Sequence, residues 1–401
     1  MTSLLFLLVL AVFTELAARW WIRWRRAYYV FPPGLRLRLH PDRDAFPELE
    51  PVVRIEINSE GERGHELPRL RSDQTLYRIL VAGGSQPEGY LLDQDTSWPG
   101  ALQQILATPG HLQMLGASAV HVGNIARSGI GAEALDLVLA RVLPRYGRLQ
   151  AIIILVGASD MLRWLEQGAP PQPPASARTS DIFRCHPEGP FGWRPSALAA
   201  VELLRRTRRR WLRTEQVHER AGKWIDQARA MRARAAVIRT APPPAGPVVE
   251  HFELHLRSAI RRARSHADRV LIVRQPWLEK PAYSQDEAAH MWHGGVGQAW
   301  RENVTTYYSV EVTCALMTLF DRAAARVAVD LGVEQLDLMP ILEPSLNTYY
   351  DFFHLTPSGA RAVATAVAAA LIRQAVPGSA DPDVWIRGNS DNGRLQQRRA
   401  G

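Results

Sequence analysis

Short apolar runs alternate with longer helical stretches along most of the chain. The first run, at residues 77–82, consists mainly of aliphatic and β-branched side chains, as is typical of a parallel strand buried on both faces. Four similar runs follow, and segments with a helical pattern separate them. The predicted strands are 77–82, 118–123, 150–156, 269–274 and 333–338. The predicted helices lie near 97–107, 132–146, 194–235, 248–266, 309–330 and 357–374.

Strands that alternate with helices imply a parallel sheet with helices on both faces. We therefore predict one α/β domain at 75–375, a three-layer α/β/α, flavodoxin-like fold with a central parallel sheet of about five strands. Within it, 163–250 is interpreted as an insertion, and its proline- and serine-rich first part as a mobile loop. The polar tail at 376–401 is predicted to be disordered.

The N-terminal 30 residues combine an apolar run with an aromatic and basic flank. Residues 3–18 carry Glu15 as their one charge, and four arginines, three tryptophans and two tyrosines follow at 19–31. This pattern predicts a single-pass membrane helix that ends in an interfacial belt, an anchor at 1–30. A cleaved signal peptide is less favoured because no basic residue precedes the run, and a soluble amphipathic helix is the remaining alternative. The basic flank favours a cytoplasmic position for the bulk of the protein.

A connector rich in proline and charge links this helix to the main domain at 31–76. Polar and apolar residues alternate at 53–57, and turn residues follow at once. The connector is therefore predicted to hold a small β element.

The formal net charge is +8, which favours an acidic partner surface. The segment 205–213 gathers several arginines around Trp211, and it is either a helix on an anionic membrane surface or a solvated helix face. Specific nucleic-acid binding is not predicted, because no recognition module accompanies the arginines. Cys185 and Cys314 stand far apart without a C-x-x-C pair, so a thiol-ligated zinc site is not predicted.

Candidate chemistry begins where the first predicted strand ends. Gly83 and Gly84 let the backbone turn sharply there, and Ser85 follows at once. Ligands of open α/β sheets bind at the carboxyl ends of the strands, so Ser85 is placed as a serine nucleophile would be. The alternative is an ordinary strand-to-loop turn, because glycine–serine turns are frequent.

A serine nucleophile needs a base, and the base needs an orienting acceptor. Asp351 and His354 lie three residues apart, just before a helix that Thr356 and Pro357 can start. On a tight turn, the carboxylate can reach Nδ1 of His354 while Nε2 faces outward. The alternative interpretation makes Asp351 and Thr356 helix caps and His354 a partly buried surface histidine.

An acyl-transfer site also needs donors for the oxyanion. Two stretches that leave the second and third strands reach the same rim as Ser85. In the first, Gly129 can offer a backbone N–H where a side chain would block the approach. In the second, Ser159 can offer a hydroxyl.

A glycine-containing loop between the fourth and fifth strands holds His290, Trp292, His293 and Trp300. Aromatic faces suit sugar rings or acyl chains, so these residues, Trp292 and His293 above all, are predicted to line a substrate cleft, and a plain surface loop is the alternative. His290 and His293 also suggest a metal, but no acidic or cysteine partner has the right spacing, and no metal is predicted.

Together these pieces resemble the SGNH (GDSL-type) hydrolase family over 75–375, in particular its membrane-anchored bacterial members. The family's nucleophile block, G-D-S-x, reads Gly83-Gly84-Ser85-Gln86 here. Its other blocks are matched by Asn124 with Ser128-Gly129, by Gly157-Ala158-Ser159-Asp160, and by Asp351 with His354. The N-terminal apolar helix, the stretch INSEGERG at 57–64 and Gln275-Pro276-Trp277 resemble the anchored members.

Two positions depart from the family pattern. Gly84 replaces the aspartate before the serine, which should mainly alter the hydrogen bonding of the turn. Ser159 replaces the asparagine that would donate to the oxyanion, and a hydroxyl is a shorter and less fixed donor. Loss of one such donor typically lowers the rate about 100- to 1000-fold.

The resemblance implies a serine esterase that needs no cofactor. Ser85 would attack the ester carbonyl, His354 would carry the proton and Asp351 would orient His354. The backbone N–H groups of Ser85 and Gly129, with Ser159, would hold the oxyanion. The implied substrates are acetyl or acyl esters of carbohydrate or lipid. An O-acyltransferase with the same triad, or a catalytically weak domain that binds glycan or organises a membrane assembly, are the alternatives.

Overall fold

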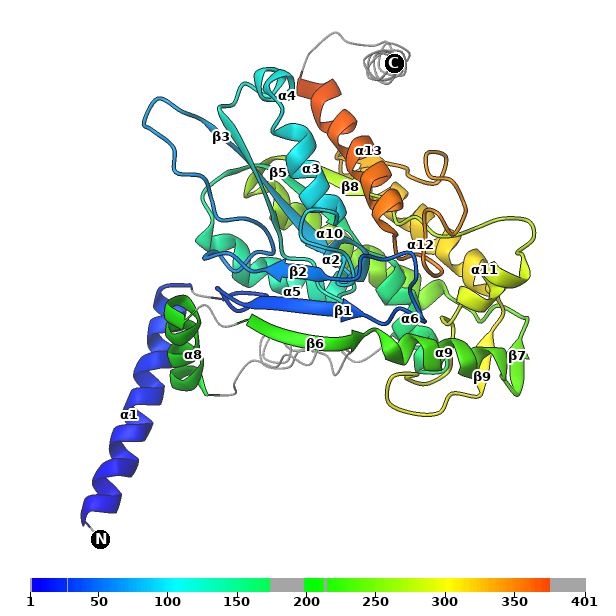
Figure 1. Cartoon of the computed structure of the whole chain (residues 1–401), viewed down its shortest axis with the longest axis horizontal. Helices are drawn as coiled ribbons and strands as arrows, with labels where there is room; N and C mark the ends of the chain where they lie inside the picture. The colour runs from blue at the N-terminus through cyan, green and yellow to red at the C-terminus, as the bar shows by residue number, and fades with distance from the viewer. Residues whose placement is uncertain (1, 27, 174–197, 213–214, 376–401) are drawn as a thin grey trace, which may run out of the picture.

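A five-stranded parallel sheet forms the middle layer of the computed structural model, which describes residues 2–26, 28–173, 198–212 and 215–375 (Figure 1). Its strands are β3 (Leu76–Gly83), β4 (Ala119–Asn124), β5 (Leu149–Leu155), β8 (Ala267–Val273) and β10 (Glu334–Leu336). They lie side by side in the order β10-β8-β5-β3-β4. Counted along the chain this is the flavodoxin-like order, whose switch point lies between β3 and β5. The predicted fold class and the five parallel strands are confirmed.

Helices cover both faces of this sheet. The chain steps outward from β3 to β4 and then back to β5, so right-handed crossovers place the two connecting helices on opposite faces. α3 packs with α13 on one face, and α5, α10 and α12 pack together on the other. These helices are α3 (Trp98–Leu106), α5 (Ala132–Val142), α10 (Gly246–Arg264), α12 (Val310–Asp330) and α13 (Pro357–Ala375). The shorter ones are α2 (Ser85–Glu88), α4 (Pro109–Met114), η1 (Leu143–Arg145), α6 (Ala158–Glu166) and α11 (Gln285–His290).

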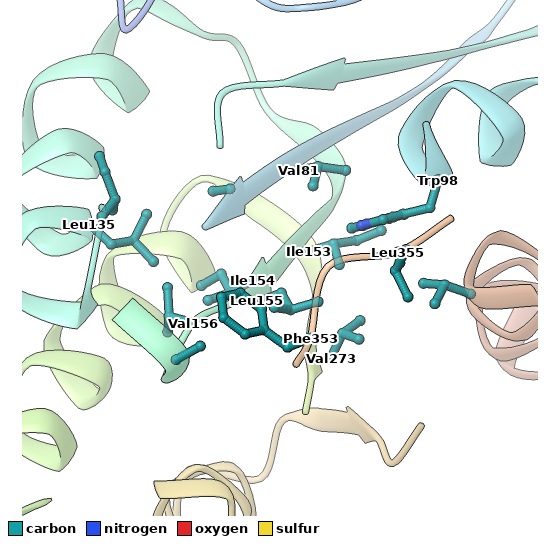
Figure 2. Close-up of a cluster of buried hydrophobic side chains, with 14 of the residues drawn as sticks. Val81, Trp98, Leu135, Ile153, Ile154, Leu155, Val156, Val273, Phe353 and Leu355 are labelled. Atoms are coloured by element: carbon teal, nitrogen blue, oxygen red, sulfur yellow. The ribbon is translucent and has the colours of Figure 1, made fainter. Parts of the chain in front are cut away.

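The core fills the space between the sheet and its helices. The aliphatic run of β5 is wholly buried, because neighbouring strands flank it and helices cover both of its faces. Figure 2 shows Trp98 of α3 and Leu135 of α5 on opposite sides of this run. Phe353 and Leu355 join the same cluster, so the core fixes the loop before α13 as well.

A second sheet, of order β2-β1-β6, lies beside the domain (Figure 1). Its strands are β1 (Arg36–Pro41), β2 (Val53–Glu56) and β6 (Glu215–Ala221). The β element predicted in the connector is present. The continuous helix predicted near 194–235 is wrong, because α8 (Ala199–Leu212) and α9 (Lys223–Ala233) flank β6. Strand β6 forms because it pairs in parallel with β1, which lies about 180 residues earlier in the sequence. A local helical pattern carries no information about a pairing partner at this distance.

The N-terminal helix, α1 (Thr2–Trp24), projects away from the domain with α8 beside it (Figure 1). Its segment Ser3–Trp24 is long and apolar enough to cross a membrane, a test that a signal sequence also passes. Glu15, the one charge in the apolar run, accepts hydrogen bonds of 3.0 Å from the backbone N–H groups of Ala199 and Ala200. Its carboxylate therefore caps the start of α8.

Some predictions fall on residues outside those described. These are the disordered tail at 376–401, the second half (174–180) of the predicted mobile loop at 167–180, and Cys185. The domain boundaries, including the insertion at 163–250, remain predictions. The remaining strands, β7 (Val237–Arg239) and β9 (Thr306–Tyr308), pair with each other and tie this insertion to the segment before α12.

Candidate active site

Ser85 lies at the switch point of the sheet, directly after β3. Gly83 has a φ of +156°, and a Cβ there would lie 2.0 Å from the carbonyl oxygen of Leu155. Only glycine allows β3 to run this close to the end of β5. The chain then turns, and Ser85 becomes the first residue of α2, with its hydroxyl at the carboxyl end of the sheet.

His354 comes to Ser85 from the far end of the sequence. Phe353 and Leu355 on either side of it are buried in the core, so the backbone of His354 is held and its ring points to the rim. The distance from His354 Nε2 to Ser85 Oγ is 2.8 Å. Gln86, next to Ser85, donates a further hydrogen bond of 3.2 Å to the carbonyl oxygen of Phe353. The two segments are therefore joined at adjacent residues.

Asp351 is fully buried and holds the histidine ring. Its Oδ2 lies 2.7 Å from His354 Nδ1, and its Oδ1 accepts the backbone N–H groups of Phe353 and His354 at 3.0 and 2.8 Å. Burial by itself raises the pKa of Asp351, but the facing imidazoles of His354 and His293 and these hydrogen bonds outweigh it, and the pKa lies below its usual range. An ionised Asp351 accepts a hydrogen bond from the Nδ1–H of His354, which leaves Nε2 of His354 to accept a hydrogen bond from the Ser85 hydroxyl.

Trp292 and His293 both lie next to this carboxylate. The indole N–H of Trp292 donates a hydrogen bond of 2.9 Å to Asp351 Oδ2, so Trp292 is a direct neighbour of the Asp351–His354 pair. His293 packs on Trp292 with its ring centroid 3.7 Å away and is 6% exposed. Burial lowers the pKa of His293 to about 3, so this ring is neutral at physiological pH. Neither of its nitrogens has a hydrogen-bond partner among the described residues.

The two predicted oxyanion donors lie on the same rim as Ser85. Gly129 has a φ of +75°, a conformation that glycine adopts readily, and with Ser159 it lines the cavity that holds Ser85. The loop before it is fixed because the N–H of Arg127 donates to the carbonyl of Gly83 at 3.0 Å. A Cβ on Gly84 would lie 3.1 Å from Ser159 Oγ, so these two departures from the family pattern are neighbours in space.

Asn124 and Asp160 have structural contacts instead. Asn124 Nδ2 donates to the carbonyl of Pro87 at 2.6 Å, which joins the end of β4 to α2. Asp160 Oδ1 accepts the N–H of Ala132 at 2.8 Å and so holds the first turn of α5. Burial raises the pKa of Asp160 to about 7.

A cavity of about 320 Å³ opens in front of Ser85 and His354. Three tryptophans form much of its wall, and they lie on α9 and on the loop between β8 and β9. Trp224 packs edge-on against Trp292 and Trp300, with ring centroids 4.9 and 6.1 Å apart. Polar groups also line the cavity, among them Arg163 and Glu166. The cavity therefore offers both aromatic and hydrogen-bonding contacts to a ligand.

Among the residues that the structure describes, two groups of side chains bring metal-ligand types close together. The ligand atoms of His293, Asp351 and His354 lie within 4.8 Å of one another, as do those of Glu133, His251 and His255. In the first group the hydrogen bond from His354 Nδ1 to Asp351 already uses two of the ligand atoms. His290 belongs to neither group and binds the carbonyl oxygen of Asp286 at 2.8 Å.

No protein-family model matches the sequence, and neither does any curated protein. Among solved structures, an acetylxylan esterase from Geobacillus stearothermophilus is similar at 12% identity and a TM-score of 0.38, over 74% of this chain and 94% of that one. A lipolytic protein of the G-D-S-L family from Veillonella parvula is similar at 10% identity and a TM-score of 0.37, over 73% and 96%. A psychrotrophic esterase from a Pseudoalteromonas species is similar at 10% identity and a TM-score of 0.37, over 74% of this chain and 98% of that one.

At these identities and TM-scores the three structures carry no argument about the chemistry of the site, which has to come from the geometry of the site itself. Trp292, His293 and Trp300, which the sequence predicts to line a cleft, do line this cavity, whereas His290 is not among its lining residues. Trp224 had no such signal, because it lies in a segment predicted as a plain helix and only the tertiary fold brings it to the cavity.

Proposed function

We propose that the protein is a serine esterase of the SGNH type. The observation that carries the proposal is the continuous hydrogen-bonded chain from Ser85 Oγ through His354 to the buried carboxylate of Asp351. A neutral His354 with its proton on Nδ1 accepts from the serine hydroxyl, which is the arrangement a nucleophilic serine needs. Turn or cap roles alone give no reason for residues 269 positions apart to meet at 2.8 Å.

The reaction then runs in two acyl-transfer steps. Ser85 Oγ attacks the ester carbonyl while its proton moves to His354 Nε2. The tetrahedral oxyanion binds the N–H groups of Ser85 and Gly129, and Ser159 donates its hydroxyl. When the carbon–oxygen ester bond breaks, the leaving alcohol takes the proton from His354. A water molecule repeats the sequence on the acyl-enzyme, and the products are a carboxylic acid and the free serine.

The substrate class that we propose is an acetyl or acyl ester of carbohydrate or lipid. The aromatic wall formed by Trp224, Trp292 and Trp300 supports a sugar ring or an acyl chain, and the polar residues that also line the cavity support a hydroxyl-bearing ligand. If a sugar hydroxyl replaced water in the second step, the same residues would act as an O-acyltransferase.

The test is labelling of the purified protein by a fluorophosphonate probe, with Ser85→Ala and His354→Ala for comparison. We expect labelling of the wild type and a loss of it in both variants, because the probe needs an activated serine. Circular dichroism checks that each variant is folded. A folded wild type that does not react would overturn the esterase proposal and favour a binding domain on a hydrolase scaffold.

We also propose that α1 anchors the protein in a membrane. Leu4, Phe6 and Phe13 are each more than 60% exposed, which supports contact with lipid rather than with the domain. The exposed Trp211 and Leu212 near the end of α8 support contact of this helix with the membrane surface. The basic flank of α1 favours a cytoplasmic domain. A topology reporter fused after Gly401 tests this orientation. We expect it to report a cytoplasmic position, and an extracytoplasmic position would overturn the orientation.

A further inference from the structure

The stretch at 57–64 and the last residue of the nucleophile helix remain without a role in the mechanism above. Helix α2 has only four residues, with Ser85 at its start and Glu88 at its end. Glu88 is 4% exposed although it is a carboxylate. Burial of a carboxylate costs free energy unless nearby groups compensate it, so Glu88 needs hydrogen-bonding partners in its surroundings.

The Glu88 carboxylate binds the loop between β4 and α5, which carries Gly129 and is called the oxyanion loop below. Glu88 Oε2 accepts the backbone N–H of Ser128 at 2.7 Å and also the Ser128 hydroxyl. Ser128 directly precedes Gly129, whose N–H is a proposed oxyanion donor. Helix α2 therefore carries the nucleophile at its first residue, and at its last residue it carries the side chain that holds the oxyanion loop.

Arg63 holds the C-terminal end of this helix, the end at which Glu88 lies. It donates to the carbonyl oxygens of Glu88, Gly89 and Leu92, the last two at 2.8 and 2.7 Å, which satisfies carbonyls where α2 ends. Its backbone forms two hydrogen bonds with Asn124, at 2.8 and 3.0 Å, just before the oxyanion loop begins. Arg63 thus contacts both segments that Glu88 joins.

The position of Arg63 is itself fixed by buried polar contacts. Glu62 binds His121 at 2.8 Å, Arg78 at 3.0 Å and Asn58 at 3.0 Å, and it is wholly buried. Gly123 lies so close that a Cβ there would meet the Glu62 carboxylate at 2.4 Å. The stretch at 57–64 is therefore built into the sheet edge, although it precedes the α/β domain in sequence.

We propose that Glu88 and Arg63 are positioning residues that set the distance between the Ser85 nucleophile and the Gly129 donor. This proposal rests on the proposed function, because it assigns a role to residues that support Ser85 and Gly129. Their effect falls on the transition state, since the oxyanion forms only there. Loss of Glu88 should therefore lower kcat and leave KM nearly unchanged.

The experiment measures hydrolysis of p-nitrophenyl acetate by the full-length protein in detergent, with Ser85→Ala, Glu88→Gln and Glu88→Ala. Both Ser128 bonds go to one oxygen of Glu88, and the amide oxygen of glutamine can still accept them. We expect kcat to fall about 100-fold in Glu88→Ala and about 10-fold in Glu88→Gln, with KM within about twofold of wild type. The Ile152→Val variant, in the buried middle of β5, is the matched control for a loss of stability and should keep its kcat.

The possible failures are distinguishable. If Ser85→Ala hydrolyses the ester as the wild type does, the proposed function is wrong. If Ser85→Ala is inactive but both Glu88 variants keep the kcat of Ile152→Val, the positioning role is wrong and the proposed function stands. Should Glu88→Ala fail to fold, Glu88→Gln and Ser128→Ala decide the question. Unchanged kcat in those two overturns the positioning role, and a lowered kcat at unchanged KM supports it.

Discussion

Ser159 is the residue at which the site departs most from the donor set of the family it resembles. It lines the cavity with Ser85 and Gly129, and a Cβ on Gly84 would approach its hydroxyl. A carboxamide at this position reaches further and rotates less, so it should donate better to the oxyanion. We predict that Ser159→Asn raises kcat about 10-fold toward a soluble ester, with KM nearly unchanged.

The control for this change is Ser159→Ala, which removes the donor and should lower kcat about 10-fold. Steady-state kinetics of the three proteins, with equal far-ultraviolet circular dichroism, provide the comparison. Equal kcat values in all three would show that the residue at 159 does not donate to the transition state.

Asp160, next to Ser159, should make stability depend on pH. Burial raises the pKa of Asp160 in the fold to about 7, whereas an unfolded aspartate has a pKa of about 4. Between these values the folded protein holds more protons than the unfolded chain. The contribution of Asp160 to stability is therefore fully present below about pH 4 and is lost as the pH rises toward 7.

The variant Asp160→Asn should remove this dependence, because the amide oxygen keeps the bond from the N–H of Ala132 without a charge. We predict that its melting temperature exceeds that of the wild type by a few degrees at pH 8 and that the difference shrinks at pH 5. Thermal unfolding at both values tests this. Asp73→Asn, on a side chain that is 71% exposed, is the control and should show no such difference. An Asp160→Asn protein that melts below the wild type at pH 8 contradicts the prediction.

At the scale of whole elements, the contact between α1 and α8 depends on Glu15. Its carboxylate accepts two N–H groups at the start of α8, and removal of such a cap typically costs about 1 kcal/mol. We predict that Glu15→Ala loosens α8 and raises the rate of trypsin cleavage after Arg205 and Arg208 about fivefold. Mass spectrometry of the first fragments measures this rate. The same rate in Glu15→Ala and wild type would mean that side-chain packing alone holds the two helices together.

The predictable elements are those whose pattern is local. The inner strands β3, β5 and β8 carry apolar runs buried on both faces, so their sequence reports their position, and the place of Ser85 directly after β3 put it on the rim where ligands bind. The spacing of Asp351 and His354 before a helix indicated the histidine and its carboxylate partner. Strand β6 carries polar and exposed residues, and its ladder with β1 decides its form. The role of Glu88 was equally hidden, because a glutamate at the end of a short helix is ordinary until Ser128 is seen beside it.

At the scale of the whole molecule, the candidate site and helix α1, the proposed anchor, are separate parts. The residues of the proposed reaction lie between Arg63 and His354, whereas α1 contacts the rest of the protein chiefly through α8. Arg26, just after α1, donates a hydrogen bond of 3.0 Å to the carbonyl of Pro144, and this contact is exposed. Loss of α1 should therefore leave the geometry of the site unchanged.

We predict that a protein lacking residues 1–27 moves from the membrane fraction to the soluble fraction and hydrolyses a soluble ester with a kcat/KM within about threefold of the full-length protein in detergent. The full-length Ser85→Ala variant should stay in the membrane fraction but lose activity. Membrane attachment and ester hydrolysis are then each lost without the other in one of the two proteins. A truncated protein that is folded and still sediments with membranes would assign the attachment to another surface, with the exposed Trp211 and Leu212 of α8 as the first candidate. A truncated protein that is folded, soluble and inactive would instead mean that α1 supports the site through α8 and the β2-β1-β6 sheet, because this sheet adjoins the stretch that carries Arg63.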